Sequence, residues 1–399
     1  MNSARKRKHI FLGIKDKKIR LFKSQTSFYI RLMKILHIGQ LIGGLDIYIR
    51  NTINYADNSF EYIIAHGVSD KNQPIIKDGK EIKEYNISLY RELNPIKDLK
   101  GLLQVLSIIR KEKPDIIHCH SAKGGFIGRF AGFITHTKTF YTPHAFSFLS
   151  TQNRLKKSIF LFLERLARLD SYLLACSNSE KELGISLVHY KENKSLAWSN
   201  SVPDANYVST QIEKGQSPYI CYIGRPSYQK NPFFLVNVIK EVHKKHPNIQ
   251  FYILGVGYYS PDLERLKSMI KDYQLENTII LLPWLNHDET MRYVKDSLFY
   301  LTTSRYEGLP LAVIEAMSLG KCIVASNVLG NKDCVKDNYN GYLLPLKEEV
   351  FADKINYLIE HSEKRQVFEE NSRKYFEEKF FIKNRIKYLE DIYKGNLDN

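Results

Sequence analysis

From Met33 onward the chain alternates short runs of β-branched and aromatic residues with longer amphipathic stretches. In those stretches apolar residues recur every three to four positions, as on one face of a helix. This alternation is typical of an α/β fold with parallel sheets. The pattern predicts strands at 34–39, 62–66, 115–120, 139–143 and 172–177, and then at 219–224, 249–255, 278–282, 298–303 and 321–326.

The spacing of these elements predicts two Rossmann-like domains. Helical spacing over 98–113 ends at Pro114, which a helix interior does not tolerate. The periodicity lapses before a second alternating series begins, so we predict domains at 33–205 and 218–375 with a linker at 206–217. A last helix is predicted over 377–393, and its apolar spacing requires a partner surface.

The charge of the chain is concentrated at its beginning. Residues 1–32 hold ten Lys or Arg and one acidic residue, which accounts for +9 of the net charge of +16. This basic leader mixes Lys and Arg with Ile, Leu and Phe, which suits a peripheral contact with an anionic membrane. The alternatives are a solvated tail or a protein that naturally starts at Met33.

The remaining bulk properties favour a cytoplasmic protein. No apolar run reaches the ~18 residues of a membrane-spanning helix, and the leader has no apolar core of signal-peptide length. The five cysteines form no Cys-x-x-Cys pair, so we expect buried, reduced thiols.

The segment 304–326 predicts a strand, a loop and a helix. Glu307 lies in the loop, and Pro310 suits the first helical position, where its missing N–H has no effect. Glu315 lies ~7.5 Å beyond Pro310 along the axis, so the two carboxylates are placed to grip polyol hydroxyls on either side of a diphosphate. Free amides at such a helix start bind phosphate or sugar hydroxyls, and here they belong to Gly308, Leu309, Leu311 and Ala312. The alternative is an amphipathic helix with one solvated glutamate.

A second turn offers positive charge. Arg225 and Lys230 follow a predicted strand that ends at Gly224, and Asn231-Pro232 suits the start of the next helix. Arginine presents a rigid fork and lysine a mobile point charge, so together they can neutralise a diphosphate. The alternative is two surface cations.

A glycine pair, Gly43-Gly44, follows the first predicted strand and lets the backbone approach a ligand closely. It is not a Gly-x-Gly-x-x-Gly fingerprint, so an NAD-type site is disfavoured.

Three histidines, His118, His120 and His144, end predicted strands of the first domain. The carboxyl ends of parallel strands are where such sheets place ligands. No third ligand follows His118-x-His120 at a zinc spacing, so we expect polar contacts rather than a metal. No Asp-x-Asp pair occurs to hold a divalent ion, so neither a metal nor a cofactor is predicted.

Taken together, Arg225…Lys230 and Glu307-Gly-Leu-Pro…Glu315 resemble the retaining, GT-B-fold glycosyltransferases of family four, over Met33 to about Leu344. The resemblance implies two Rossmann-like domains facing across a cleft, with a C-terminal helix within 376–399 that returns to the N-terminal domain.

A subgroup of that family builds bacterial capsule, O-antigen and related lipid-linked glycans. His118-x-His120 with Lys123, followed by Thr142-Pro143-His144, resembles this subgroup.

The resemblance also implies a role for each candidate residue. His144 would face the donor hexose, Arg225 and Lys230 would hold the donor phosphates, Glu307 would bind sugar hydroxyls and Glu315 the ribose. Trp284 would contact the base, and the other donor-site residues would be Gly43, Gly44, Gly224, Gly308, Leu309 and Leu311. The acceptor would be bound by His118, His120 and Lys123.

Three positions depart from the family pattern. Asp46 stands where Glu is frequent, Asn200-Ser201-Val202 replaces Asn-Gly-Val, and Asp333 stands where Glu is common. None of them removes a charge needed at the diphosphate, but they leave donor and acceptor specificity open.

The expected activity is transfer of a hexosyl or N-acetylhexosaminyl group from a nucleotide-sugar, with UDP as the expected nucleotide, to a lipid-linked or oligosaccharide acceptor. Fixed cations would stabilise the leaving diphosphate without a metal, and the anomeric configuration would be retained. The first alternative is a nucleotide-sugar 2-epimerase on the same fold.

The second alternative is a non-catalytic protein that binds anions or nucleic acid. We expect no nucleic-acid partner, because the basic stretch lies outside the fold. The expected location is the cytoplasm, including the inner face of the cell membrane.

Overall fold

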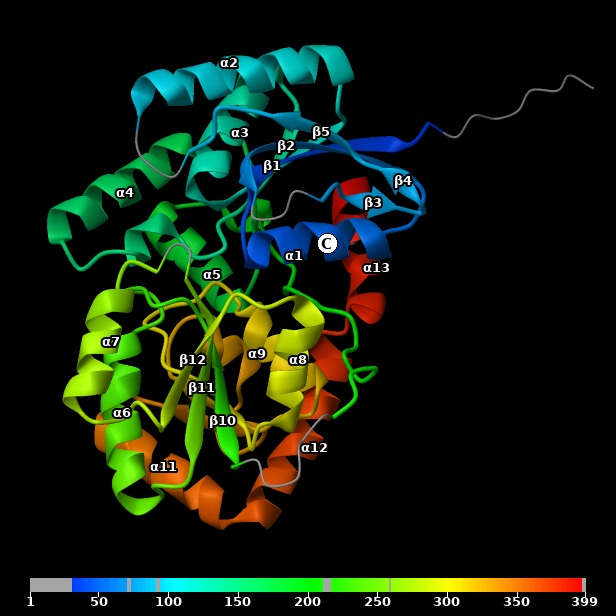
Figure 1. The fold of residues 1–399 in the computed structure, drawn as a ribbon. Helices are drawn as coiled ribbons and strands as arrows, with labels where there is room; N and C mark the ends of the chain where they lie inside the picture. Colours follow the sequence, from blue (N-terminus) through cyan, green and yellow to red (C-terminus); the bar gives the residue numbers. More distant parts are fainter. Residues whose placement is uncertain (1–30, 70–72, 91–93, 211–216, 258–259, 397–399) are drawn as a thin grey trace, which may run out of the picture. The chain divides into compact units, whose positions relative to one another are not determined.

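The first half of the fold is a seven-stranded, wholly parallel sheet in the order β5-β2-β1-β6-β7-β8-β9 (Figure 1). The computed structural model describes residues 31–69, 73–90, 94–210, 217–257 and 260–396. The strands are β1 (Met33–Leu41), β2 (Phe60–Ser69), β5 (Lys83–Asn86), β6 (Ile116–His120), β7 (Lys138–Thr142), β8 (Tyr172–Ala175) and β9 (Ser195–Ala197). A small hairpin pairs β3 (Ile76–Lys77) with β4 (Lys80–Glu81).

The second half is a six-stranded parallel sheet in the order β12-β11-β10-β13-β14-β15. Its strands are β10 (Tyr219–Ile223), β11 (Gln250–Val256), β12 (Ile279–Pro283), β13 (Tyr300–Thr302), β14 (Ile323–Ser326) and β15 (Gly341–Leu344). The prediction of two Rossmann-like sheets is therefore confirmed. The exact domain limits stay a prediction, and residues 211–216 of the predicted linker lie outside the described residues.

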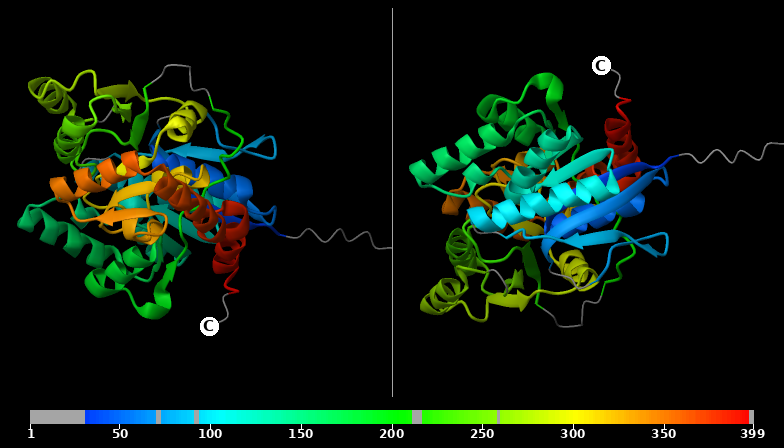
Figure 2. Two further views of the ribbon diagram at one scale, coloured as in Figure 1. Left: turned by 90° about the horizontal axis from the view of Figure 1, so that it is seen from below. Right: turned by 90° about the horizontal axis from the view of Figure 1, so that it is seen from above.

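Helices cover both sheets (Figures 1 and 2). Those of the first half are α1 (Gly44–Tyr55), α2 (Pro95–Glu112), α3 (Ser121–Thr135), α4 (Arg154–Ala167) and α5 (Asn178–Leu183). Those of the second half are α6 (Pro232–Lys245), α7 (Leu263–Asp272), α8 (His287–Asp296), α9 (Leu311–Ser318), α10 (Asn331–Cys334), α11 (Glu348–Glu360), α12 (Ser362–Lys379) and α13 (Ile382–Lys394). Within the part of the chain that the structure describes, none of the helices is long and apolar enough to cross a bilayer.

Local sequence signals explain where several helices begin and end. Asn94 caps α2 by accepting the Lys97 amide at 3.1 Å, and the helix ends at Lys113, which is left-handed and precedes proline. Asn286 and Glu289 form a capping box at the start of α8. The predicted helix over 98–113 is thus confirmed with a slightly earlier start.

The predicted final helix over 377–393 is wrong as one element. The chain leaves the helical conformation at Phe380 and Phe381, because their segment pairs with the backbone of Val202. The Val202 amide donates to the Phe380 carbonyl at 3.0 Å, and Ile382 donates to the Val202 carbonyl at 3.1 Å. After this break α13 turns back onto the first sheet, as the resemblance implied.

Contacts of α13 show how it returns. Its Tyr393 hydroxyl lies 2.6 Å from Nδ1 of His118, and its Glu390 accepts the Asp57 amide at 2.8 Å. Helix α13 is red in Figures 1 and 2, and it packs against α1. The basic leader at 1–32 lies, apart from its last two residues, outside the described residues.

Candidate active site

The turn that follows β10 and the loop that follows β13 are joined by hydrogen bonds. Lys230 Nζ lies 2.6 Å from Glu307 Oε1, and the Gln229 amide donates to Glu307 Oε2 at 3.0 Å. The Arg305 amide donates to the Gln229 carbonyl at 2.8 Å, and Ser304 Oγ donates to Glu307 at 2.6 Å. Lys230 and Glu307 are therefore one ion pair, with Glu307 buried and Lys230 partly exposed.

Helix α9 starts directly after this loop. Pro310 has an extended ψ of 111°, and its carbonyl accepts the Ile314 amide at 3.2 Å. Pro310 is thus the N-cap and not the first helical residue as predicted, which moves the start of the helix by one position. The Leu311 and Ala312 amides still belong to the first turn, where a helix has no carbonyl of its own to pair them.

The histidine turn after β7 lies against the same loop. A Cβ added to Gly308 would lie 2.7 Å from the Ala145 nitrogen and 2.8 Å from the His144 carbonyl carbon. His144 and Ala145 both have left-handed backbones, with φ of 52° and 79°, and such strain is retained where the surroundings hold it in place. Here the buried Glu180 accepts the Ala145 amide at 2.7 Å.

Two of the three segments that depart from the family pattern contribute to this junction, one through Asn200, which the family pattern shares, and one through the departing residue Asp333. Asn200 donates to the Leu309 carbonyl at 2.8 Å. Asp333 accepts the amide of Ser179 at 3.1 Å and also binds the Ser179 hydroxyl. The third, Asp46, instead pairs with Arg50 at 2.8 Å within α1. Asn200, which the family pattern shares, and Asp333 thus join residues of the two halves, while the replaced residue Ser201 donates its hydroxyl to the Ser199 carbonyl at 2.9 Å.

The remaining donor-site candidates lie around the same region. A Cβ at Gly43 would lie 3.8 Å from the Trp284 ring, and one at Gly44 would lie 3.5 Å from Leu311. A Cβ at Gly255 would lie 3.9 Å from the Arg225 nitrogen and 4.0 Å from Trp284. The structure therefore brings the glycine pair of the first half toward the second sheet.

Glu315 is buried and paired with a residue that the sequence analysis did not select. Nε2 of His287 lies 2.9 Å from Glu315 Oε1. His287 is the first residue of α8, and a cavity at that helix start is lined by Asn286, His287, Asp288, Glu289 and Arg292.

The histidines of the first sheet form a hydrogen-bonded cluster. Thr142 Oγ1 donates to the Leu174 carbonyl at 2.6 Å, so Nε2 of His118, 2.8 Å from that oxygen, must be its donor. His118 Nδ1 then accepts from the Tyr393 hydroxyl. Both nitrogens of His118 are used inside the protein.

A second series of imidazole contacts ends at the turn after β7. His37 Nδ1 lies 2.9 Å from His120 Nε2, and His120 Nδ1 lies 3.2 Å from His144 Nε2. His37 Nε2 is buried and has no hydrogen-bond partner among the described residues. A buried N–H without an acceptor is rarer than a buried acceptor without a donor, so His37 donates from Nδ1, and His120 donates to His144. His144 then carries its proton on Nδ1, which is left to donate to a ligand.

Burial keeps these rings neutral. It lowers the pKa of His37 and of His144 to about 3, and it lowers the pKa of His118 and His120 well below the ordinary value. The neighbouring imidazoles add to the effect at His118 and His120. At neutral pH the cluster thus holds orientation and tautomers rather than charge.

The predicted acceptor residues are not at an open surface. His118 and His120 are fully buried, and Lys123 is paired with Asp98. Nitrogens of His37, His118 and His120 lie within 4.8 Å of one another, but the hydrogen bonds above account for the cluster. Both nitrogens of His118 are thus used in polar contacts inside the protein, and the acceptor role of these residues stays a prediction.

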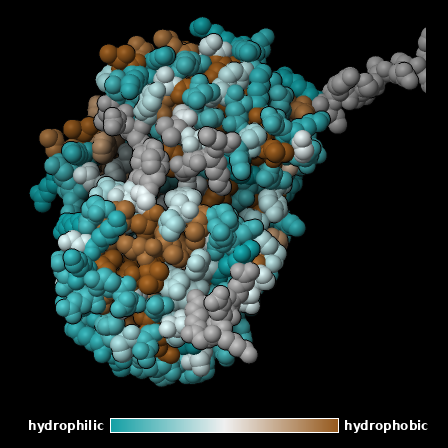
Figure 3. Space-filling view, viewed as in Figure 1, coloured by the Kyte–Doolittle hydropathy of each residue, from teal (hydrophilic) through white to brown (hydrophobic). Residues whose placement is uncertain are grey.

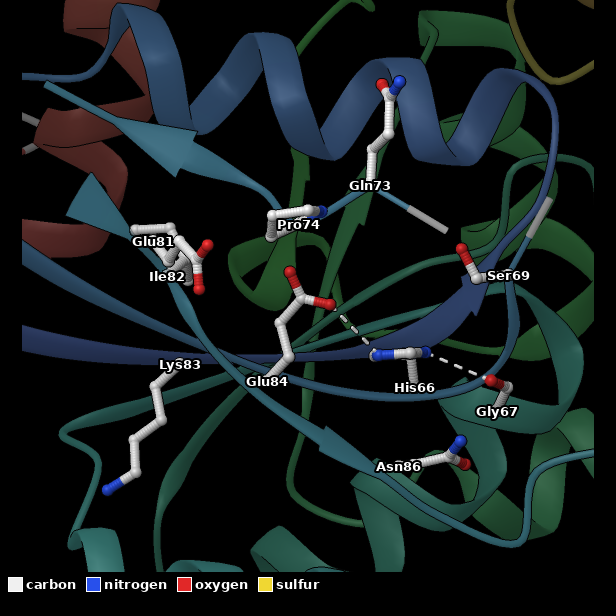
Figure 4. Close-up of a pocket in the computed structure, with 10 residues that line it drawn as sticks. All are labelled: His66, Gly67, Ser69, Gln73, Pro74, Glu81, Ile82, Lys83, Glu84 and Asn86. Carbon is white, nitrogen blue, oxygen red and sulfur yellow. Dashed lines mark hydrogen bonds and ion pairs between the residues drawn. The ribbon is translucent and has the colours of Figure 1, made fainter. Parts of the chain in front are cut away.

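A separate cavity of about 790 Å³ opens near the carboxyl ends of β2 and β5 (Figure 4). Figure 4 shows His66 between Glu84 and the Gly67 carbonyl, at 3.2 Å and 3.1 Å. None of the residues predicted for the site lines this cavity.

Four residues that contact the candidate site were not predicted from the sequence, namely His37, Glu180, Gln229 and His287. His37 could have been found, because it lies in strand β1 at the position that pairs in register with His118 of β6. No local pattern marks Glu180, Gln229 or His287, because each is defined by a partner distant in sequence or by the fold of a turn.

Two family models match the sequence of the chain. The first, described as Glycosyltransferase Family 4, matches residues 42–206, and the second, Glycosyl transferases group 1, matches residues 207–375. Together they cover residues 42–375, which include every strand of both sheets except β1 (Met33–Leu41). The chain belongs to the GT-B glycosyltransferases of family four.

Two curated relatives of this glycosyltransferase are named as a galactosyltransferase that acts on a lipid-linked diphosphate and as a capsular polysaccharide glycosyltransferase. It is 29% identical over 323 residues to UDP-Gal:alpha-D-GlcNAc-diphosphoundecaprenol alpha-1,3-galactosyltransferase of Escherichia coli, covering 77% of this chain and 82% of that protein. It is 26% identical to the capsular polysaccharide biosynthesis glycosyltransferase CapM of Staphylococcus aureus, covering 80% and 88%.

A solved structure supports the fold of the glycosyltransferase. The Anabaena protein Alr3699/HepE, solved in complex with UDP and glucose, matches with a TM-score of 0.74 at 16% identity, over 91% of this chain and 99% of that one. The predicted GT-B fold is therefore confirmed.

The neutral histidines give a testable pH dependence. Unfolding returns the pKa of His37 from about 3 to its ordinary 6.5, so between these pH values the unfolded chain binds more protons and stability falls as pH falls. For one such histidine, the free energy of unfolding falls by about 1.4 kcal/mol between pH 7.5 and pH 5.5. We expect His37→Phe to shrink the pH 7.5-to-5.5 difference in unfolding free energy by about that amount, measured by urea unfolding. An unchanged difference would contradict the assigned neutral state.

Proposed function

We propose that this glycosyltransferase moves a hexosyl or N-acetylhexosaminyl group from a UDP-sugar to a lipid-linked diphosphate acceptor, with retention at the anomeric carbon. The names of the Escherichia coli and Staphylococcus aureus relatives support this substrate class. The observation that carries the proposal is the Lys230–Glu307 pair at the start of α9, next to the His144 turn.

The chemical problem is the loss of a nucleoside diphosphate from an anomeric carbon. Negative charge grows on the leaving phosphate while the sugar becomes oxocarbenium-like, and stabilising such developing charge is usually the largest catalytic contribution. In our proposal Arg225, Lys230 and the first amides of α9 supply that stabilisation. Glu307 binds sugar hydroxyls and holds Lys230 in place, and Glu315 binds the ribose beside His287.

His144 has a more specific proposed role. With its proton on Nδ1 it donates a hydrogen bond to an oxygen of the donor hexose, and being neutral it does not oppose positive charge on the sugar. His120 and His37 act through His144 by holding this tautomer. Trp284, which is 56% exposed, offers a ring face for the base.

We further propose that turnover does not require a divalent ion. In this proposal Arg225 and Lys230 supply the positive charge that a bound cation would otherwise bring to the diphosphate. The acceptor hydroxyl attacks on the face that the diphosphate leaves, and the bond from the anomeric carbon to the phosphate oxygen breaks with its electron pair on that oxygen. The hydroxyl proton passes to the leaving diphosphate, and closure around the reacting groups limits hydrolysis. No nucleic-acid partner is part of the proposal.

The test is an assay of the purified full chain with detergent-solubilised GlcNAc-diphosphoundecaprenol. UDP-Gal, UDP-Glc, UDP-GlcNAc and UDP-GalNAc are compared, with and without EDTA. We expect UDP release from one donor that requires the acceptor, and turnover within about twofold in EDTA, since the cations are part of the chain.

Other outcomes would point elsewhere. UDP or an epimer formed from UDP-GlcNAc alone would identify an epimerase. Loss of turnover in EDTA, restored by added metal, would overturn the metal-free mechanism. A nucleotide-sugar at 100 times its Kd stabilises the folded protein by about 2.7 kcal/mol, which raises the melting temperature measurably. A rise in melting temperature with GDP- or dTDP-sugars alone would overturn the choice of UDP.

A further inference from the structure

Helix α4 carries a row of large apolar side chains on its solvent side. Leu155, Ile159, Phe162 and Leu166 are 71%, 46%, 63% and 49% exposed. Their spacing of four, three and four residues puts them on one face of the helix. The opposite face holds the buried Glu164. The apolar side chains of this row therefore face solvent rather than the protein core.

Helix α2 shows the same arrangement. Ile96, Leu99 and Leu103 are 82%, 57% and 58% exposed, while Val105 and Ile109 on the other face are buried. Helix α3 packs against both α2 and α4, and the right panel of Figure 2 shows α2 lying across the near side of the first sheet. In Figure 3 brown residues lie at the top, over α2, and at the left edge, over α4.

The exposed charge around these rows is positive. Lys100 and Arg110 border the row of α2, and Lys156 and Arg165 border that of α4, all four being exposed. We call the outward surface of α2 and α4, with these seven apolar and four basic residues, the α2–α4 face.

The acidic residues of the three helices are all neutralised within the protein. Asp98 pairs with Lys123 at 2.5 Å and Glu112 with Lys83 at 2.6 Å. Glu164 is buried and pairs with Arg129 at 2.9 Å. Among the described residues of α2, α3 and α4 there is no other acid, so the face presents unbalanced positive charge.

We propose that the α2–α4 face binds a lipid bilayer that carries anionic headgroups. Amphipathic helices with large apolar residues on one side and Lys or Arg at the border insert at the boundary between headgroups and acyl chains. Anionic lipid attracts the basic border. A second copy of the chain is a poorer occupant, because a twofold contact would bring the same basic residues together.

The proposal goes beyond the function proposed above and does not need it. Binding is measured without a sugar donor or acceptor, so failure of one proposal leaves the other standing. If both hold, the first sheet faces the membrane from which a lipid-linked acceptor would be supplied.

The experiment is co-sedimentation of the full chain with vesicles. One vesicle is phosphatidylethanolamine with about 30% phosphatidylglycerol, and the other is phosphatidylcholine alone. The double variant Leu155→Ser, Phe162→Ser removes two apolar side chains of α4. The matched control, Tyr357→Ser with Val367→Ser, removes two apolar side chains that are 38% and 51% exposed on α11 and α12.

We expect the wild type and the control to bind the anionic vesicles equally. The α4 variant should bind them at least ~10-fold more weakly, because each apolar side chain that inserts into the bilayer adds to the free energy of binding. Equal binding by the α4 variant, which would assign any membrane contact to other residues such as the leader, would overturn the proposal. So would equal binding to phosphatidylcholine, or a dimer in gel filtration that only the α4 variant dissociates. Circular dichroism checks that each variant is folded.

Discussion

Replacing Lys230 with alanine is expected to lower the turnover of the glycosyltransferase at least ~100-fold, as loss of a fixed electrostatic donor does in other enzymes. Lys230 lies 2.6 Å from Glu307 beside the start of α9. Its removal takes away positive charge at the proposed diphosphate and leaves a buried carboxylate without its cation. Arg225→Ala and Glu307→Ala are expected to have losses of the same order.

The matched control is Lys83→Ala. Lys83 forms an ion pair of the same length, 2.6 Å, with the buried Glu112, but it lies outside the site. Turnover of this variant should stay within about twofold, because Lys83 pairs with Glu112 and with none of the residues proposed to bind the donor. Initial rates with saturating donor measure the effect, and melting temperatures separate lost catalysis from lost folding. Near-normal rates in Lys230→Ala, Arg225→Ala and Glu307→Ala would refute the site.

Replacing Gly308 with alanine is expected to lower turnover about 100-fold, the cost of misplacing reacting groups by about 1 Å. The new Cβ would meet the Ala145 nitrogen and the His144 carbonyl carbon at 2.7 and 2.8 Å. Both are backbone atoms, which have no rotamer by which to move away. The loop of Glu307 and the histidine turn must therefore separate.

The readout that distinguishes this effect from unfolding is nucleotide binding. The residues proposed to hold UDP lie mainly in the second half, so UDP should still stabilise Gly308→Ala while its turnover is lost. The control Gly79→Ala adds a Cβ with nothing within 4 Å, although the backbone there also has a positive φ, of 76°. It should lose some stability and retain turnover. A fully active Gly308→Ala would show that the close contact is not needed for catalysis.

The positions of most strands along the chain and of the main motifs were predictable from the sequence. The sequence of a parallel strand that is buried on both faces is a continuous apolar run. The predicted limits of β1, β6, β10 and β11 are therefore close to the observed ones. The missed strands are short segments, such as β5, β9 and β15, whose few residues give no periodicity. The pairing of Lys230 with Glu307 follows from two loops at neighbouring strand ends, a placement that the α/β pattern itself implies.

What the sequence alone determined is therefore the alternation of elements, the two sheets and the family motifs, because these depend on local periodicity and on residues close together in the chain. Tertiary structure decided the rest. It buried His118 with both nitrogens occupied, placed His37 behind His120 and His144, paired Glu315 with His287, and broke the last helix at Phe380 to pair with Val202. Each of these outcomes depends on which residues distant in sequence come into contact. The hydrogen-bond partners of a buried polar group are defined only when the whole chain is folded around it.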